Sequence, residues 1–358
     1  MKSRNKHIDI TKGVGILIIV FGHNWIVFNP KGELFNIIFS FHVPLFFFLS
    51  GLFFNPFRSL SSTIVSKFDS LLKPYFVTLV LVGIADAIYK GDNFAYYFSK
   101  VLYGNGETIP WLWLQLWFLP HLFAVTVFSW LTIYAFHKIK INENLQYLFM
   151  FGLLIIGVNF IGFFWNLDVT FWSGTKTKLP GLPFSIDIIP ITIFYFLIGY
   201  SLKSYVLKFK PSLIFVLLSL LIFLACHYFF NKTIDLNLRI YDGLFVPTFE
   251  AFSGIYLLLS ISYMLQLDVT TSRLFSYFGS ASLLILIFHR YFQSETFFFA
   301  ANYLKGKYFL IAIFAFIVGS IIPLVMWSII KKIDLLALFY LPIKTNNLLR
   351  RDAKSCSL

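Results

Sequence analysis

Apolar segments about 20 residues long recur from residue 11 to residue 330, with short polar breaks between them. A run of about 20 apolar residues can cross the hydrocarbon core of a bilayer as a helix. The spans must be helices because the alternating pattern of barrel strands does not occur in this sequence. Charged residues make up 13% of the 358 residues, against roughly 25% in soluble domains. The sequence therefore predicts an all-α, polytopic transmembrane helical bundle.

Hydropathy predicts about ten transmembrane helices. They cover residues 11–28, 34–54, 73–90, 114–136, 145–164, 184–202, 211–230, 245–266, 277–299 and 307–330. Two polar stretches, 91–113 and 165–183, are expected to be loops on the outer side, the first of them running along the membrane interface. No segment remains for a sizeable soluble domain. We therefore expect one transmembrane domain over residues 1–335 and a basic cytoplasmic tail over residues 336–358.

The distribution of positive charge predicts the orientation in the membrane. With the N-terminus inside, nineteen of the 29 Lys and Arg residues fall in cytoplasmic segments, nine fall on the opposite side, and Arg290 lies within a span. The positive-inside rule then places both termini in the cytoplasm, in a multi-pass protein of the cell inner membrane. Because the charges are scattered through short loops and helix ends, the bilayer is an expected partner and nucleic acid is not.

Several ionisable side chains lie inside predicted helices, where each costs on the order of 2.5–3.5 kcal/mol to insert. They are His23, His42, His121, Glu250, His289 and Arg290. At about 1.5 Å per residue, the three histidines 23, 42 and 289 all come about 18 Å from the cytoplasmic face, and His121 comes near the same level. A neutral histidine can also simply hydrogen-bond a neighbouring helix, and this interpretation stays open for each of them. Their shared depth indicates a polar site, and no metal is expected in it.

Lys12 and His23 are eleven residues apart in the first predicted helix. Eleven steps of about 100° leave the two side chains about 20° apart on one helix face, separated by roughly 16 Å along the axis. That separation is comparable to an extended pantetheine arm. The alternative for Lys12 is an ordinary lysine that sets membrane topology.

Three further segments combine polar residues with helix-disturbing ones. They are SFHVPLFFFLSG at residues 40–51, LWFLPHLF at residues 116–123 and SASLLILIFHRYF at residues 280–292. Pro44 interrupts the second predicted helix, and Ser50 with Gly51 permits close backbone approach. Such a helix can expose polar backbone to a substrate, or it can be a kink that packs on another helix, and the sequence does not separate the two. Arg290 within a span favours a functional or ion-paired side chain.

These segments, with IDITKGVGILIIVFGH near the N-terminus and LKPYF at residues 72–76, resemble the acyltransferase-3 superfamily of integral membrane acyltransferases. The similarity is greatest to its fucose 4-O-acetylase, exopolysaccharide and O-antigen O-acetyltransferase branch. The motifs occur in the family's order over nearly the whole chain. The resemblance implies ten core helices, acetyl-CoA as the acyl donor, and an acceptor hydroxyl presented from the outer side.

By matching motifs, the resemblance makes His23 the catalytic histidine and Lys12 its basic partner. Many relatives carry arginine at this position and near the start of the third helix, where this chain has Lys67 and Lys73. Lysine binds phosphate as a point charge and lacks the bidentate grip of arginine. With Arg58, these lysines are the candidates for holding the phosphates of coenzyme A.

The predicted reaction is transfer of an acyl group, most simply acetyl, onto a sugar hydroxyl of a cell-surface polysaccharide or its undecaprenyl-linked precursor. His23 would act as the general base. The candidates for binding the sugar or stabilising the oxyanion are His42, Ser50, Gly51, His121, Glu250, His289 and Arg290. A transporter, such as a flippase of lipid-linked oligosaccharide, is the main alternative, because buried charges also mark transport paths. A glycan polymerase is the third, although its outer loops ought to be larger and richer in charge.

Overall fold

The structure is a computed structural model that describes residues 5–28, 32–164, 167–170, 174–179, 181–230 and 233–343. The described residues are almost entirely helical, and nine of their helical segments are long and apolar enough to cross a membrane. The prediction of an all-α polytopic membrane protein is therefore confirmed. The basic residues of the predicted tail, Lys344, Arg350, Arg351 and Lys354, lie outside the described residues.

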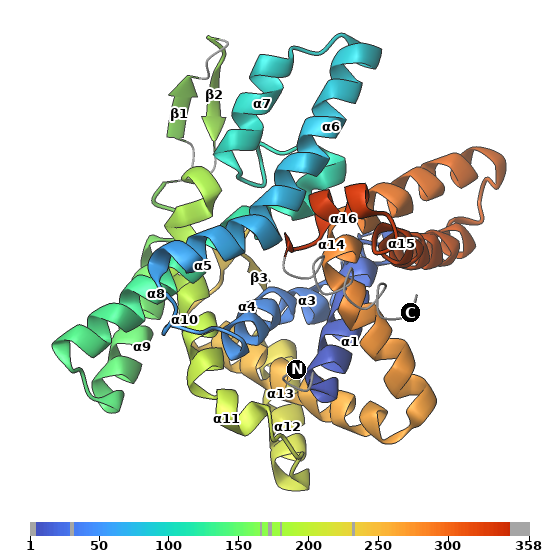
Figure 1. Ribbon diagram of the computed structural model, residues 1–358. Coiled ribbons are helices and arrows are strands. Elements are labelled where there is room, and N and C mark those ends of the chain that lie inside the picture. The colour runs from blue at the N-terminus through green and yellow to red at the C-terminus, as the bar shows by residue number, and fades with distance from the viewer. Residues whose placement is uncertain are drawn as a thin grey trace, which may run out of the picture. The chain divides into compact units, whose positions relative to one another are not determined.

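The chain divides into two compact units, and the first contains most of the helices (Figure 1). Its elements are α1 (Lys6–Gly22), α2 (Trp25–Phe28), α3 (Glu33–Phe39), α4 (His42–Leu52), α9 (Glu143–Phe160), α10 (Ile189–Ser201), α11 (Lys203–Val206), α12 (Leu213–Phe230), β3 (Ile234–Asp235), β4 (Ile240–Tyr241), α13 (Phe245–Leu267), α14 (Val269–Tyr303) and most of α15 (Tyr308–Ile330). The two short strands form a small antiparallel pair.

The second unit is built around α6 and α8. Its elements are α5 (Leu60–Lys67), a π-helical turn (Phe68–Leu72), α6 (Lys73–Lys90), α7 (Phe94–Tyr103), a 3-10 segment (Trp111–Trp117), α8 (Phe118–Ile139), β1 (Leu167–Thr170), β2 (Lys176–Leu179), a second 3-10 segment (Pro183–Ile188) and α16 (Asp334–Tyr340). The strands β1 and β2 form an antiparallel hairpin in which Leu167 pairs with Leu179.

Helix α1 packs along α14 at a crossing where each helix contributes a glycine. A Cβ atom on Gly13 would overlap the carbonyl oxygen of Phe275, and one on Gly279 would overlap that of Asp9. Small residues allow the two backbones to approach this closely, as is typical of helix pairs in membranes. The start of α1 is also fixed, because the His7 ring lies 2.9 Å from the Leu259 carbonyl oxygen of α13. The crossing therefore fixes the position of the rest of α1, including its end at Gly22.

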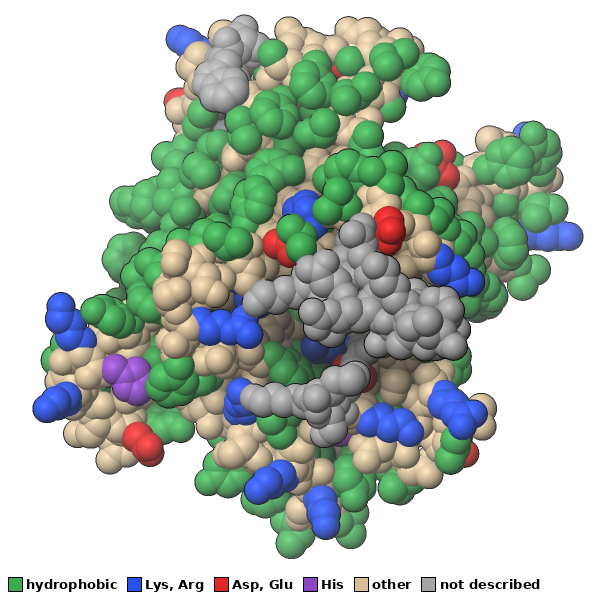
Figure 2. All heavy atoms as spheres, in the orientation of Figure 1, with side chains coloured by type: hydrophobic (Ala, Val, Ile, Leu, Met, Phe, Trp, Pro, Cys, Tyr) green, Lys and Arg blue, Asp and Glu red, His purple; other side chains and the backbone are tan. Residues whose placement is uncertain are grey.

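Hydrophobic side chains cover much of the face drawn in Figure 2. On α12, Leu213 and Ile214 are about three-quarters exposed, and on α15, Leu310 is 63% exposed. Apolar side chains this exposed on helices of this length are expected to face lipid. The outer surface of the described helices agrees with a multi-pass membrane protein.

Several predicted boundaries were wrong. The first helix ends at Gly22 rather than continuing to residue 28, and the second divides at Ser40–Phe41 into α3 and α4. Pro44 is not the break itself, because it lies in the first turn of α4, where its missing N–H costs no helical hydrogen bond.

The predicted loops also contain regular structure. Residues 91–113 hold helix α7, and residues 165–183 hold the β1–β2 hairpin. Helix α14 is longer at both ends than its predicted range of 277–299, and α16 crosses the predicted boundary of the tail at residue 335. Polar residues lower the hydropathy of these segments below the value that a membrane span requires, so hydropathy did not predict helices there.

Candidate active site

His23 lies at the residue where α1 ends. Its backbone N–H still bonds to the Ile19 carbonyl oxygen at 3.1 Å, but α2 begins two residues later and the regular helix stops. The imidazole is half-buried and stacks on the Phe28 ring, with its edge toward Phe39. Within the described part of the chain, neither ring nitrogen has a hydrogen bond. The ring is therefore held by aromatic contacts while its nitrogens stay available to a substrate.

His289 of α14 lies beside His23, with 5.5 Å between the ring centroids and 29° between the ring planes. The side chain is fully buried, and its Nδ1 lies 2.7 Å from the Ile285 carbonyl oxygen. That contact makes Nδ1 the donor and leaves Nε2 as an acceptor. Nε2 is buried without a hydrogen-bond partner among the described residues. A buried acceptor without a donor is costly, and such atoms are common where a substrate binds.

His42 completes this set, which we call the histidine cluster: His23, His42 and His289. His42 begins α4, and its Nδ1 lies 2.8 Å from the Ile38 carbonyl oxygen across the break between α3 and α4. The Phe39 ring packs against His42 at 4.6 Å between centroids and against His23 at 6.2 Å. His289, His42 and Arg290 all lie within electrostatic range of His23. The sequence correctly predicted that these residues converge.

Gln293 is a residue that the sequence reasoning missed. It lies one turn beyond His289 on α14 and is 3% exposed, yet neither of its amide atoms has a hydrogen-bond partner in the described chain. His23 contacts His289 on this face, and Trp25 stacks on Phe297 one turn further at 5.6 Å. In sequence Gln293 falls between these two contacts of α14, and its side chain lies beside Gly319 of α15. The i, i+4 spacing from His289 was the available signal.

Lys12 lies half-buried on α1, about three turns before His23. Its Nζ is 4.5 Å from the centroid of the Phe53 ring, at the end of α4. A cation over an aromatic face is attracted by about 0.5–1 kcal/mol at an exposed site. The contact orients the ammonium group at that end of the unit.

Ser50 and Gly51 have packing roles in this structure. The Ser50 hydroxyl donates its single hydrogen to the Phe46 carbonyl oxygen at 2.7 Å. A Cβ atom on Gly51 would overlap the Phe196 carbonyl oxygen, and Gly199 meets Phe48 in the same way. Of the two interpretations left open by the sequence, this geometry favours a small-residue contact between α4 and α10 over an oxyanion site.

His121 belongs to the second unit and fastens a strained turn there. Its Nδ1 lies 3.0 Å from the Phe184 carbonyl oxygen, and the ring lies 5.6 Å from Trp117. Phe184 and Ser185 both have positive φ angles, an unfavourable conformation for residues other than glycine. The fully buried histidine supplies a partner for backbone in that turn. This geometry favours a structural role for His121.

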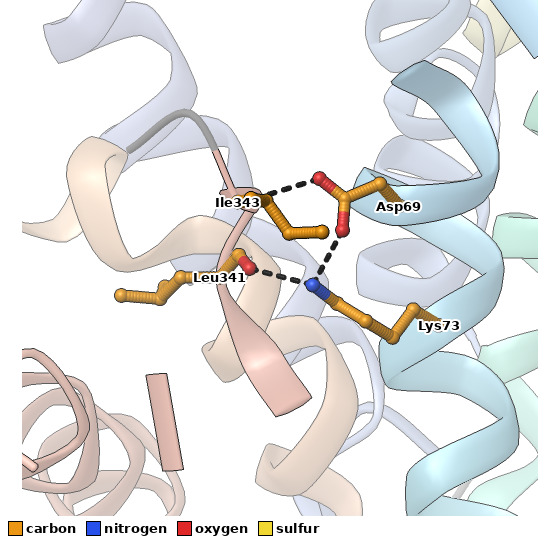
Figure 3. Close-up of polar contacts among 4 residues, drawn as sticks. All are labelled: Asp69, Lys73, Leu341 and Ile343. Carbon is orange, nitrogen blue, oxygen red and sulfur yellow. Dashed lines mark hydrogen bonds and ion pairs between the residues drawn. The ribbon is translucent and has the colours of Figure 1, made fainter. Parts of the chain in front are cut away.

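Lys73, predicted to hold coenzyme A phosphates, has hydrogen-bond and ion-pair partners within the second unit (Figure 3). Its Nζ lies 2.5 Å from Asp69 Oδ1 and donates to the Leu341 carbonyl oxygen at 2.8 Å, while Asp69 Oδ2 accepts the Ile343 N–H at 2.8 Å. These contacts, which we call the Lys73 latch, fasten the segment after α16 to the π-helical turn and α6. Arg58 is exposed and Lys67 half-buried in the same unit.

A family comparison decides the class of protein. The family model described as an acyltransferase domain matches residues 5–331, nearly the whole chain. The chain belongs to the acyltransferase-3 family. A search of curated proteins and a search of solved structures found no match.

Family membership supports the prediction of a membrane acyltransferase over the transporter and the glycan polymerase. The matched range begins at Asn5, which caps α1 by accepting the Ile8 N–H through its side chain, and it includes the complete histidine cluster. Among the described residues, the histidine cluster at the end of the first helix contains a buried atom without a hydrogen-bond partner, His289 Nε2.

Proposed function

We propose that this acyltransferase moves an acetyl group from cytoplasmic acetyl-CoA to a sugar hydroxyl of a cell-surface polysaccharide, or of its undecaprenyl-linked precursor, at the inner membrane. The observation that carries the proposal is His23. Its ring is fixed by aromatic contacts, its nitrogens make no hydrogen bond in the described chain, and His289 lies 5.5 Å away between centroids. This is the geometry expected of a base that waits for an external proton donor.

The reaction needs one proton transfer in each direction. His23 takes the proton of the acceptor hydroxyl as its oxygen attacks the thioester carbonyl, giving a tetrahedral intermediate with a negative oxygen. Collapse breaks the carbon–sulfur bond, and the imidazolium returns the proton to the leaving thiolate. The products are the acetyl ester and free coenzyme A, so atoms and charge balance without a metal or a redox partner.

The negative oxygen of the intermediate needs hydrogen-bond donors. Arg290, which lies within electrostatic range of His23, carries a guanidinium with five N–H donors. The Gln293 amide supplies two more N–H donors that are not used inside the described protein. Removing one such donor from an enzyme costs about 10²–10³ in rate. We assign this role to Arg290 and Gln293, in place of the backbone at Ser50 and Gly51.

On the donor side, Lys12 is the cation that shares a helix with His23. We propose that its ammonium group contacts the phosphates of coenzyme A, while the pantetheine arm extends along α1 toward His23. Arg58 and Lys67 stay predictions for the same ligand, since both have charged side chains outside the Lys73 latch. His42 lies against Phe39 beside His23, and we propose that it helps to orient the acceptor.

Membranes that contain the protein, incubated with radiolabelled acetyl-CoA and polysaccharide lacking O-acetyl groups, test the proposal. Label in the polysaccharide or in the lipid-linked fraction is the expected result, and membranes without the protein are the control. Release of free acetate without label in either fraction would contradict the assigned acceptor. A labelled protein or lipid in place of glycan would contradict it as well.

A further inference from the structure

A second polar cluster lies in the first unit and is not used by the mechanism above. It contains Glu33 at the start of α3, His227 near the end of α12, and Glu250 in the second turn of α13. His227 Nε2 lies 2.6 Å from Glu33 Oε2, and His227 Nδ1 lies 3.5 Å from Glu250 Oε1. We call these three residues the acidic column. Glu33 and His227 were both missed by the sequence reasoning.

The inner end of the acidic column has few hydrogen-bond donors. Glu250 is fully buried, and neither of its carboxylate oxygens has a hydrogen bond of acceptable geometry within the described chain. Its neighbours are His227 and the Ser40 hydroxyl, but that hydroxyl donates to the Ile37 carbonyl oxygen at 2.9 Å. One hydroxyl hydrogen serves one acceptor at a time. A buried carboxylate with so few donors is expensive unless something else supplies them.

The outer end of the column is open. The Glu33 side chain is 73% exposed, whereas that of His227 is 8% exposed and that of Glu250 is 0% exposed. The three residues therefore form a continuous polar path from the surface into the helices. Without a ligand, a neutral imidazole has one N–H to offer two carboxylates.

The column ends next to the histidine cluster. Two consecutive residues at the break between α3 and α4 make the connection: the Phe39 ring contacts His23, and Ser40 interacts with Glu250. The same short break thus contacts both polar clusters through adjacent residues.

We propose that the acidic column is the binding subsite for the glycan acceptor, with Glu250 and Glu33 each accepting hydrogen bonds from sugar hydroxyls and His227 bridging them. A hydroxyl-rich, uncharged ligand supplies the donors that Glu250 lacks, and it needs no charge partner at the exposed end. The described residues contain no group of three or more His, Cys, Asp or Glu side chains arranged to hold a metal ion. This inference rests on the proposed function, because it identifies how that function's acceptor is held.

Glycan binding is measured apart from catalysis. The full-length protein in nanodiscs is mixed with short oligosaccharides prepared from the surface polysaccharide of cells lacking this gene and tritiated at the reducing end. No acetyl-CoA is present. The variants are Glu250→Gln, His227→Gln and Glu33→Gln, with Glu295→Gln as the matched control because Glu295 is an exposed carboxylate on α14.

The wild type and Glu295→Gln should bind the oligosaccharide equally. Glu250→Gln should weaken binding by about tenfold or more, because it removes the charged acceptor of two hydrogen bonds. Glu33→Gln, at an exposed position where misfolding is not expected, should weaken binding about threefold. Binding of acetyl-CoA should stay unchanged in all three variants. Size-exclusion elution identifies any variant that fails to fold.

Wild-type glycan binding by folded Glu250→Gln and Glu33→Gln would overturn the proposal. A slower transfer with normal glycan binding and a shifted pH profile would assign the column to proton transfer and would also overturn it. His23→Ala separates the two proposals, because it should abolish transfer and leave glycan binding intact. Column-dependent binding without any transfer by the wild type would contradict the proposed function and leave the column as a glycan site.

Discussion

The histidine cluster and the Lys73 latch are both groups of ionisable side chains, but they differ in how far their polar atoms are hydrogen-bonded. In the latch, Lys73 and Asp69 bond to each other and to the backbone at Leu341 and Ile343. In the histidine cluster and on the next turn of α14, His289 Nε2 and both amide atoms of Gln293 are buried without partners in the described chain. Satisfied groups hold a fold together, and unsatisfied groups are available for a substrate. This difference, more than residue type, separates candidate catalytic residues from structural ones.

The largest effect is expected from His23→Ala, which removes the proposed base. Transfer of acetyl should fall by at least about 100-fold, while the protein still inserts and accumulates, because the ring makes no hydrogen bond in the described chain. Initial rates with radiolabelled acetyl-CoA measure this. His137→Ala is the matched control, since His137 is an exposed histidine in the second unit and should leave the rate unchanged.

Gln293→Leu sharpens the comparison, because it replaces an unsatisfied amide with an apolar side chain of similar size. The turnover number should fall roughly 10- to 100-fold through loss of an oxyanion donor. The midpoint of thermal unfolding should stay the same or rise, since a buried amide without partners loses no hydrogen bond on replacement. A large fall in the unfolding midpoint would indicate that the amide is structural. Gln146→Leu on α9 serves as the control for activity.

Lys12→Ala should weaken the binding of acetyl-CoA and leave the binding of the glycan acceptor unchanged. Loss of a charge-assisted contact to phosphate should raise the KM for acetyl-CoA roughly tenfold, with the KM for the glycan unchanged. Lys12→Arg should retain the contact. Lys6→Ala, at the exposed first residue of α1, is the control. A selective rise in the KM for the glycan would be incompatible with the proposed position of the donor.

The smallest effect on the turnover number is expected from Lys73→Met. It should lower the free energy of unfolding by about 1–3 kcal/mol, because Asp69 is left partly buried without its cation. The turnover number per folded molecule and the KM for acetyl-CoA should change less than about twofold. Lys90→Met on the same helix is the matched control. Its ion pair with Asp86 also has i, i+4 spacing but is largely exposed on the lysine side, so its loss should cost well under about 1 kcal/mol.

Lys73→Met could instead raise the KM for acetyl-CoA tenfold or more without loss of stability. That result would assign Lys73 to the binding of acetyl-CoA. In that case the hydrogen bonds of the latch would not distinguish structural from functional cations. Hydrogen-bond satisfaction would then not separate the Lys73 latch from the histidine cluster.

Hydropathy predicted about ten spans, and nine helical segments of the described residues are long and apolar enough to cross a membrane. The agreement is best for α6, which begins and ends at the predicted residues, because lipid requires long apolar helices. Hydropathy missed the end of α1 because the apolar residues Trp25–Phe28 continue the pattern after the helix stops. The convergence of His23, His42 and His289 followed from equal predicted depths.

Other features were beyond sequence reasoning. Lys73 meets Leu341 across a sequence separation of 268 residues, which no local pattern records. Gln293 carries no charge and so does not stand out in an apolar span. From the sequence, Gly51 could expose backbone to a substrate or pack on another helix. Its contact with Phe196 favours packing. The membrane helices could be predicted from composition. The role of each polar residue could be assigned only from its hydrogen-bond partners in the structure.

A comparison of His23→Ala with Lys73→Met in one transfer assay shows whether acetyl transfer depends on the histidine cluster and not on the Lys73 latch. Membranes with equal amounts of folded protein are incubated with radiolabelled acetyl-CoA and unacetylated polysaccharide, and label in the polysaccharide is counted. We predict background label for His23→Ala and nearly wild-type label for Lys73→Met. Wild-type label from His23→Ala would contradict the account.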